Sequence, residues 1–294
     1  MAAVLTGFLL AGSAHAFDWS SFPPMQFTIY DANGKRMVGH SFYRIEQDAG
    51  SYIIHGENHY LDGEYDIEID RLSPGAGKRL PRLLNFSHCF YKRDGSVRLL
   101  GELNLASGQG TCATYDPKAQ KFTAHLECPL DTSAGAALLI PIMEAFKSGR
   151  RSPLPLHVFD CAPQPKVLAV TVQANAKDHR WPLYPGHLVE IEVAPNLGWW
   201  NVLLGPFLPR VRAWFDPAQN WGYVGGRIHH YFYRGPEVQL VKTHARPEHS
   251  GGRAASSADV NGSAKDASQS LRAGANASRR VQAPQPLADG ADQK

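Results

Sequence analysis

Residues 61–70 read LDGEYDIEID, and this stretch decides the fold class because its acidic residues recur at every second position. The acidic positions are Asp62, Glu64, Asp66, Glu68 and Asp70. Side chains alternate between the two faces of a strand, so a period of two indicates a β-strand with one acidic and one apolar face, and it excludes an amphipathic helix. We interpret the acidic face as a solvent-exposed surface that pairs with Lys and Arg on neighbouring strands.

The alternative interpretation of this face is a site for a cation or for a basic partner. Successive carboxylates on one face of a strand lie about 6.6 Å apart. That spacing is wide for shared ligation of one ion, so we prefer the solvent-exposed surface.

Further strand-like runs, separated by turn signals, extend in both directions from this stretch. The dipeptides Asn33-Gly34, Asp94-Gly95 and Asp116-Pro117 are typical of turns. The other predicted strands are residues 25–30, 36–46, 51–60, 82–91, 97–104, 111–115, 122–128, 154–159, 167–173, 187–193, 208–215 and 223–233. Strands at this close spacing, with one helical interruption, predict an all-β domain built as an antiparallel meander.

The helical interruption is residues 131–147, DTSAGAALLIPIMEAFK. Residues 131–133 offer N-cap side chains, and Gly149 lies where a helix commonly ends. The apolar residues at three- and four-residue spacing are Leu138, Leu139, Ile142, Met143 and Phe146. Pro141 predicts a kink or a break, because proline lacks a backbone donor. A single helix in a meander has to bury its apolar stripe, and we expect it against the concave face of a curled sheet.

The two ends of the chain differ from its middle. Residues 2–12 form an apolar run, and residues 13–16, Ser-Ala-His-Ala, match the pattern that signal peptidase cleaves. We expect a signal peptide at residues 1–16 and a periplasmic location, although no Lys or Arg precedes the run; a mature N-terminal strand, or a start codon chosen too far downstream, is the alternative. Residues 243–294 contain almost no large apolar side chain, which predicts a disordered tail. One folded domain is then expected at residues 17–242.

Charge and hydropathy exclude two classes of partner. The net charge of +3 and the pI of about 8.6 are too mild for a nucleic-acid-binding surface. After the signal peptide, no apolar stretch approaches the roughly 18 residues that a membrane-spanning helix needs. We therefore expect no nucleic acid and no transmembrane span in the mature chain.

Four cysteines lie in the expected domain, at Cys89, Cys112, Cys128 and Cys161. Their spacing matches no zinc motif, and an even number in an exported protein favours disulfides. A hairpin of residues 111–115 and 122–128 brings Cys112 close to Cys128. The sequence does not choose further among the three possible pairings.

No motif carries a recognisable chemistry. Residues 74–78, PGAGK, end like a phosphate-binding loop, but Leu72 stands where that motif needs its first glycine. The chain has 13 histidines, yet no local spacing brings three metal ligands to one face. We therefore predict no catalytic residue, no metal and no cofactor.

A second apolar segment is residues 197–209, LGWWNVLLGPFLP. It can be a core strand, but its glycines and prolines break it into pieces that suit a loop. An aromatic loop at the rim of a curved sheet would suit a lipid or an acyl chain. This interpretation adds Trp199, Trp200 and Phe207 to the candidate ligand-binding residues.

Several short motifs carry a resemblance to a known family. They are the helical segment at residues 131–146, the segment LPLHVFD at residues 154–160, the strand at residues 167–170, and VRAWFDP at residues 211–217. The chain resembles a bacterial periplasmic domain family of unknown function, whose shape is akin to the lipoprotein carriers LolA and LolB. The resemblance covers roughly residues 27–232, and it implies a strongly curved antiparallel half-barrel that encloses a helix.

Three functions are compatible with this fold. The first is a non-enzymatic carrier or binder of an apolar ligand, a lipid or an acylated protein, held by the helix stripe and the aromatic loop. The second is an enzyme that uses the same cleft, and the third is a structural envelope factor whose cavity is filled by its own helix. Strongly shifted titratable groups would favour the second hypothesis, and a filled cavity the third.

Overall fold

The computed structural model describes residues 17, 19, 22–75, 80–115, 118–150, 153–161, 163–175, 181, 183–184, 186–198, 210–231 and 234–243. The chain divides into two units, Met1–His244 and Ala245–Lys294. The second unit lies outside the described residues, as do the predicted signal peptide at residues 1–16 and all of the predicted tail except Thr243. The fold described below is that of the first unit.

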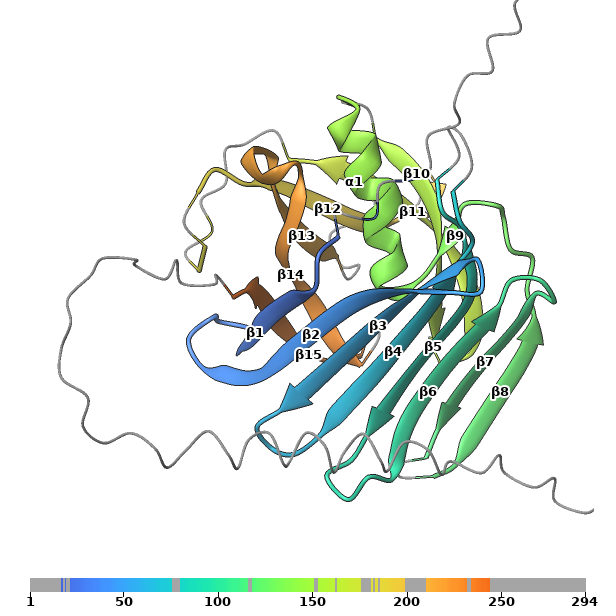
Figure 1. Ribbon diagram of the computed structural model, residues 1–294. Coiled ribbons are helices and arrows are strands. Elements are labelled where there is room, and N and C mark those ends of the chain that lie inside the picture. Colours follow the sequence, from blue (N-terminus) through green and yellow to red (C-terminus); the bar gives the residue numbers. More distant parts are fainter. Residues whose placement is uncertain are drawn as a thin grey trace, which may run out of the picture. The chain divides into compact units, whose positions relative to one another are not determined.

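The strands of the described residues form one sheet (Figure 1). They are β1 (Met25–Asp31), β2 (Met37–Asp48), β3 (Ser51–Tyr60), β4 (Tyr65–Leu72), β5 (Leu83–Tyr91), β6 (Val97–Asn104), β7 (Gln109–Thr114), β8 (Gln120–His125), β9 (Thr132–Ser133), β10 (Leu154–Cys161), β11 (Pro165–Ala174), β12 (Val189–Pro195), β13 (Val211–Asp216), β14 (Gly222–Tyr231) and β15 (Arg234–Lys242). The sheet order is β8-β7-β6-β5-β4-β3-β2-β1-β15-β14-β13-β12-β11-β10-β9. The strands pair antiparallel, except that β9 and β10 are parallel. The predicted all-β fold with one main helix is confirmed.

The sheet is open and curved, with β8 and β9 as its two edge strands. Strand β15 pairs with β1, so the meander β1–β8 and the meander β10–β15 meet in the middle of one continuous sheet. Near the edges, a disulfide between Cys112 of β7 and Cys161 of β10 joins the two meanders, with the two Cα atoms 5.6 Å apart. Curling of the sheet therefore brings its distant ends together.

The disulfide corrects the expected pairing of cysteines. Cys112 lies opposite Phe122 in the β7–β8 hairpin, and not opposite Cys128. Cys128 and Cys89 are free thiols. The expected pairing is wrong because the partner of Cys112 comes from β10, a strand that reaches β7 only through the curvature of the sheet.

The helical segment starts later than the sequence predicts. Thr132 and Ser133 form the short strand β9, and a 3₁₀ turn, η2 (Gly135–Leu138), leads into α1 (Leu139–Lys147). The predicted side-chain cap at residues 131–133 is therefore wrong. The predicted kink at Pro141 is also wrong, because Pro141 lies in the first turn of α1, where a missing backbone donor breaks no helical hydrogen bond.

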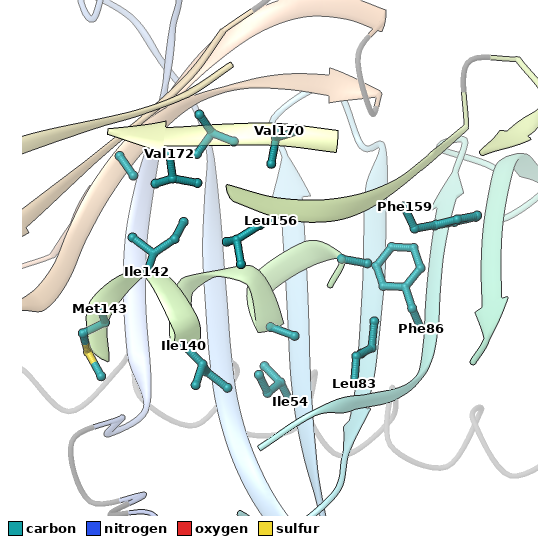
Figure 2. Packing of buried hydrophobic residues seen from close by; sticks show 14 of the residues in the cluster. Ile54, Leu83, Phe86, Ile140, Ile142, Met143, Leu156, Phe159, Val170 and Val172 are labelled. Carbon is teal, nitrogen blue, oxygen red and sulfur yellow. The ribbon is translucent and has the colours of Figure 1, made fainter. Parts of the chain in front are cut away.

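Helix α1 packs among residues of both meanders (Figure 2). Ile140, Ile142, Met143 and Phe146 are buried, while Leu138 and Leu139 are half-buried. The sheet side chains that share this core include Ile54, Leu72, Phe86, Leu156, Val172 and Ile191. Helix α1 thus lies between the two meanders on the concave side of the sheet and forms one wall of the space between them.

Candidate functional site

A cavity of about 260 Å³ lies between α1 and the concave face of the sheet. Its apolar walls include Phe27, Phe90, Leu139, Ile142, Phe159 and Val193, which come from both meanders and from the helix. Its polar walls include Tyr43, Asn58, Tyr60, Asp66, Glu68 and His88. The cavity is therefore mainly apolar, with its acidic and amide side chains on β3 and β4 and further polar side chains, Arg212, Tyr223, His229 and His230, on β13 and β14.

The polar wall centres on the acidic face of β4, which the sequence analysis placed in solvent. Asp66, Glu68 and Asp70 have exposed fractions of only 1, 4 and 0 %. On the opposite face of the strand, Ile69 is 39 % exposed. The expectation of a solvent-exposed acidic face is wrong, and so is the expected pairing of these three carboxylates with Lys and Arg of neighbouring strands.

Two groups of hydrogen-bond donors stabilise the buried acidic face of β4. The first group is the backbone amides at the start of the helical segment. The backbone N–H of Ala136 donates to Glu68 Oε1 at 2.6 Å, and the N–H of Ala137 donates to Asp70 Oδ2 at 2.8 Å. The first amides of a helix have no partner within the helix, and the helix dipole favours negative charge beside them. We call Asp66, Glu68 and Asp70 the acidic row. Glu68 and Asp70 of this row cap the N-terminus of the helical segment, because the residue that precedes the segment supplies no side-chain cap.

Gly135 makes this close approach possible. Its φ of +50° is a conformation that glycine adopts without strain, and a Cβ at this position would lie 2.4 Å from Glu68 Oε1. The backbone can therefore lie directly on the carboxylate.

Asp70 is the buried end of the row. Burial, together with the neighbouring Glu68 carboxylate, raises the pKa of Asp70 well above its ordinary value, although the Ala137 amide acts in the opposite direction. Asp70 Oδ1 accepts no hydrogen bond within the described residues. Two adjacent buried carboxyl groups cannot readily both ionise, so burial beside Glu68 favours the protonated form of Asp70.

The second donor is His88 of β5, which lies between two carboxylates. Its Nε2 is 2.7 Å from Asp66 Oδ1, and its Nδ1 is 3.5 Å from Glu68 Oε2. Burial alone lowers the pKa of His88, but the charges of Asp66 and Glu68 outweigh burial and raise the pKa above its ordinary value. Both ring nitrogens then act as donors, and the imidazolium partly neutralises the row.

Buried tyrosines complete the polar wall. Tyr43 of β2, Tyr60 of β3 and Tyr223 of β14 all have a raised pKa, first because they are buried and then because Asp66 or Glu68 lies nearby. Their hydroxyls therefore stay protonated near neutral pH. The Tyr43 ring packs directly over Gly56, where only a glycine leaves enough room, because a Cβ on Gly56 would lie 2.5 Å from Tyr43 Cε1.

A polar cluster at the end of β14 ties the two meanders together beside the cavity. The Tyr231 hydroxyl donates to Glu64, and Arg98 of β6 donates to the Tyr231 hydroxyl at 2.8 Å and pairs with Glu64 Oε1. The neighbouring His230 ring lies 3.9 Å from the Tyr60 ring. Burial lowers the pKa of His230 in spite of the acidic groups around it, so this imidazole is neutral near pH 7.

The structure brings together some of the predicted site residues. Leu138, Leu139 and Ile142 line the cavity. Met143 and Phe146 are instead in the core, where the Phe146 ring lies 6.2 Å from that of Trp221. The aromatic residues Trp199, Trp200 and Phe207 lie outside the described residues.

The polar wall was missed by the sequence analysis, although the strand register holds a signal for it. Asp66 lies beside Phe90, and Asp70 lies between Ile54 and Phe86. An acidic face that is exposed to solvent is expected to have polar cross-strand neighbours. Its apolar neighbours, once the register is known, indicate that this face points inward.

The geometry favours no metal site at this wall. Within the described part of the chain, no group of three or more His, Cys, Asp and Glu side chains is arranged to hold a metal ion. Glu68 Oε1 and Asp70 Oδ2 instead accept from backbone amides, and Asp66 Oδ1 interacts with His88 and Asn58. The chemistry open to the site is the binding of a small molecule that has an apolar body and a polar group.

The likenesses of this chain to known proteins lie among solved structures. No family model and no curated protein matches the sequence. Among solved structures, the chain is similar to a β-barrel-like protein of the domain of unknown function DUF1849 from Brucella abortus, with a TM-score of 0.43 and 9 % sequence identity. The similarity covers 75 % of this chain and 94 % of that chain. The likeness to LolA and LolB stays a prediction.

Proposed function

We propose that this protein binds or carries a small apolar or amphipathic molecule inside the concave cavity, as an exported protein of the bacterial envelope. The observation that carries the proposal is the cavity itself. Side chains of α1 and of both meanders surround about 260 Å³ that the helix leaves unfilled. Ligand sites are typically concave and mainly apolar, with a few placed polar groups, and this volume is near the small end of their range.

The strongly shifted pKa values of Tyr43 and Tyr60 taken alone favour an enzyme, but the direction of these shifts and the partners of the polar groups support binding better than acid–base catalysis. Asp66 and Glu68 engage both ring nitrogens of His88, which leaves the imidazole no free lone pair with which to accept a proton. The tyrosine hydroxyls have raised pKa values and do not ionise at neutral pH. These groups therefore neutralise charge and orient a ligand. The unfilled volume also argues against a purely structural protein whose helix fills the cavity.

The disulfide supports the export part of the proposal. Cys112 and Cys161 are bonded, and stable disulfides are typical of oxidising compartments such as the bacterial periplasm. Among the described residues, no helix is both long and apolar enough to span a bilayer.

The test uses full-length protein purified from the periplasm. Native mass spectrometry should detect a co-purifying small molecule, and the neutral fluorescent probe N-phenyl-1-naphthylamine should bind to the emptied protein. Leu139→Trp, which fills the cavity, should weaken probe binding at least about tenfold, a loss on the order of 1.4 kcal/mol. The control is Leu61→Trp, because Leu61 is 65 % exposed and does not line the cavity.

Two results would contradict the proposal. Wild-type protein that binds neither a co-purifying molecule nor the probe would exclude a ligand-binding cavity. Equal probe binding by Leu139→Trp and wild type, with both folded by circular dichroism, would place the probe elsewhere.

A further inference from the structure

Three buried polar atoms on the concave face have no hydrogen-bond partner among the described residues. They are Ser41 Oγ, Asn58 Oδ1 and Asp66 Oδ2. Ser41 and Asn58 are only 4 and 5 % exposed, and Asp66 is still more deeply buried. A buried polar atom without a partner has lost its hydrogen bonds to water and gained none in return, so three such atoms at one place require an explanation.

The three atoms belong to one row across the sheet. Ser41 of β2 is paired with Asn58 of β3, and Asn58 is paired with Asp66 of β4. The row continues into Phe27 on one side and Phe90 on the other. Asn58, Asp66 and both phenylalanines line the cavity, so the unpaired atoms form a polar spot between two aromatic walls.

The hydroxyls of Tyr60 and Tyr43 interact with Asp66 and Asn58 respectively, but neither reaches an unpaired atom with hydrogen-bond geometry, so these atoms require another donor. Asn58 Nδ2 donates to Asp66 Oδ1 at 2.7 Å, and because a carboxylate only accepts, this contact fixes the orientation of the amide and leaves its oxygen as the free acceptor. Asp66 Oδ2 is likewise an acceptor, and the Ser41 hydroxyl can accept as well. The complementary group on a ligand is one that carries several N–H or O–H donors.

The charges around the spot favour a cation. On β4, Asp66, Glu68 and Asp70 bring three carboxyl groups to this face, and burial beside Glu68 raises the pKa of Asp70. His88 on β5 supplies one positive charge. The tyrosines of β2, β3 and β14 are neutral, and so is His230.

The arginines nearest to the cavity do not offset the remaining negative charge. Arg98 pairs with Glu64, and Arg212, whose side chain is 41 % exposed, lies 3.9 Å from Glu190. Three carboxyl groups face the single imidazole of His88, so acidic groups outnumber basic groups in this buried site, where a cation gains most from its interaction with them.

We propose that the ligand of this cavity is an amphipathic primary amine, whose ammonium group donates to Asp66 Oδ2 and Asn58 Oδ1 while its apolar body lies along Phe27, Phe90 and Leu139. This inference rests on the proposed function and specifies its ligand class. An ammonium group carries N–H donors and a positive charge, which complement the acceptor oxygens and the acidic surroundings of Asn58 and Asp66. The cavity of about 260 Å³ has the volume of roughly nine bulk water molecules, which suits a chain of moderate length.

The first experiment needs no variant. Isothermal titration calorimetry on the full-length protein at pH 7 compares n-octylamine, n-octanol and n-octanoate, which share a chain length and differ in the polar group. Octylamine should bind at least about tenfold more tightly than octanol, because charge-assisted hydrogen bonds exceed neutral ones, and octanoate should bind most weakly.

The outcomes separate the two proposals. Equal or tighter binding of octanol or octanoate would overturn the amine inference and leave the proposed binding function intact. Binding of none of the three probes would overturn both.

A matched pair of variants then locates the recognition. Asp66→Asn should reduce octylamine affinity about tenfold or more and leave octanol affinity nearly unchanged. The control is Glu57→Gln, which removes the same charge from β3 on a solvent-exposed side chain that lies next to Asn58 in sequence and faces the other way. If Asp66→Asn fails to fold, the double change Asp66→Asn with His88→Gln removes both members of the buried pair and should lose the same preference for the amine. Retention of the preference in either folded variant would overturn the inference.

Discussion

The acidic row of β4 has two ends that differ in their partners. At one end, Asp70 and its neighbour Glu68 receive the amides of Ala137 and Ala136, so that the carboxylates anchor the helical segment. At the other end, about 13 Å along the strand, Asp66 receives Asn58 and His88 on one oxygen and presents the other to the cavity. The row thus consists of carboxyl groups throughout. Those at one end bind the helical segment, and the one at the other end is available to bind a ligand. The difference arises from the donors that the fold brings to each end.

The largest effect is expected at the helix end, from Gly135→Ala. The new Cβ would meet Glu68 Oε1 and would also impose a positive φ on alanine. We expect a loss of about 3 kcal/mol in the free energy of unfolding, measured by urea denaturation. Gly149→Ala is the control, because Gly149 has a φ of +82° with nothing within 4 Å of its Cβ position; it should lose only about 1–2 kcal/mol. Equal losses would mean that the contact with Glu68 contributes nothing.

The two carboxyl groups at the helix end, Glu68 and Asp70, should contribute differently to the free energy of unfolding. Glu68→Gln removes a charge that faces both a helix amide and His88, and we expect it to cost about 1.5–3 kcal/mol of stability. Asp70→Asn should cost less than about 1 kcal/mol, because the raised pKa of Asp70 already keeps it neutral and an amide oxygen can still accept from Ala137. The reverse order in urea denaturation would show that Asp70 carries the charge.

The pH dependence of stability reports on His88, between the two ends. Its folded-state pKa lies above the ordinary value of 6.5, so its contribution is fully present below pH 6.5 and is lost as the pH rises through the folded-state pKa. In that window the wild type should lose up to about 1.4 kcal/mol per pH unit relative to His88→Gln. Parallel stability curves for the two proteins between pH 6 and 9 would mean that folding does not raise the pKa of His88.

Most strands of the sheet could be predicted from the sequence, because the alternation of polar and apolar residues and the turn dipeptides are local signals. Strand β15 (Arg234–Lys242) was missed, since Gly235 and Pro236 read as a turn. The structure tolerates this proline beside an irregularity in the pairing of β14 with β15, between His229 and Tyr231. The omission matters, because β15 is the strand that joins the two meanders.

The candidate site was less accessible from sequence, for a physical reason. Alternation identifies two faces of a strand but does not tell which of them points inward. For β4, that choice depends on His88 and on the amides of Ala136 and Ala137, which lie 68 and 67 residues from their acceptors in the chain. The apolar stripe of α1 was found because amphipathic helices carry that information locally.

The most direct test of the two-ended row is an NMR titration of ¹⁵N-labelled wild-type protein with n-octylamine. The side-chain amide of Asn58 and the ring nitrogens of His88 should shift as the amine binds at Asp66. The backbone amides of Ala136 and Ala137 should stay in place, because their carboxylate acceptors at the helix end are not disturbed. Shifts that are largest at Ala136 and Ala137, with Asn58 and His88 unchanged, would contradict the account and would show that a ligand acts by displacing the helix.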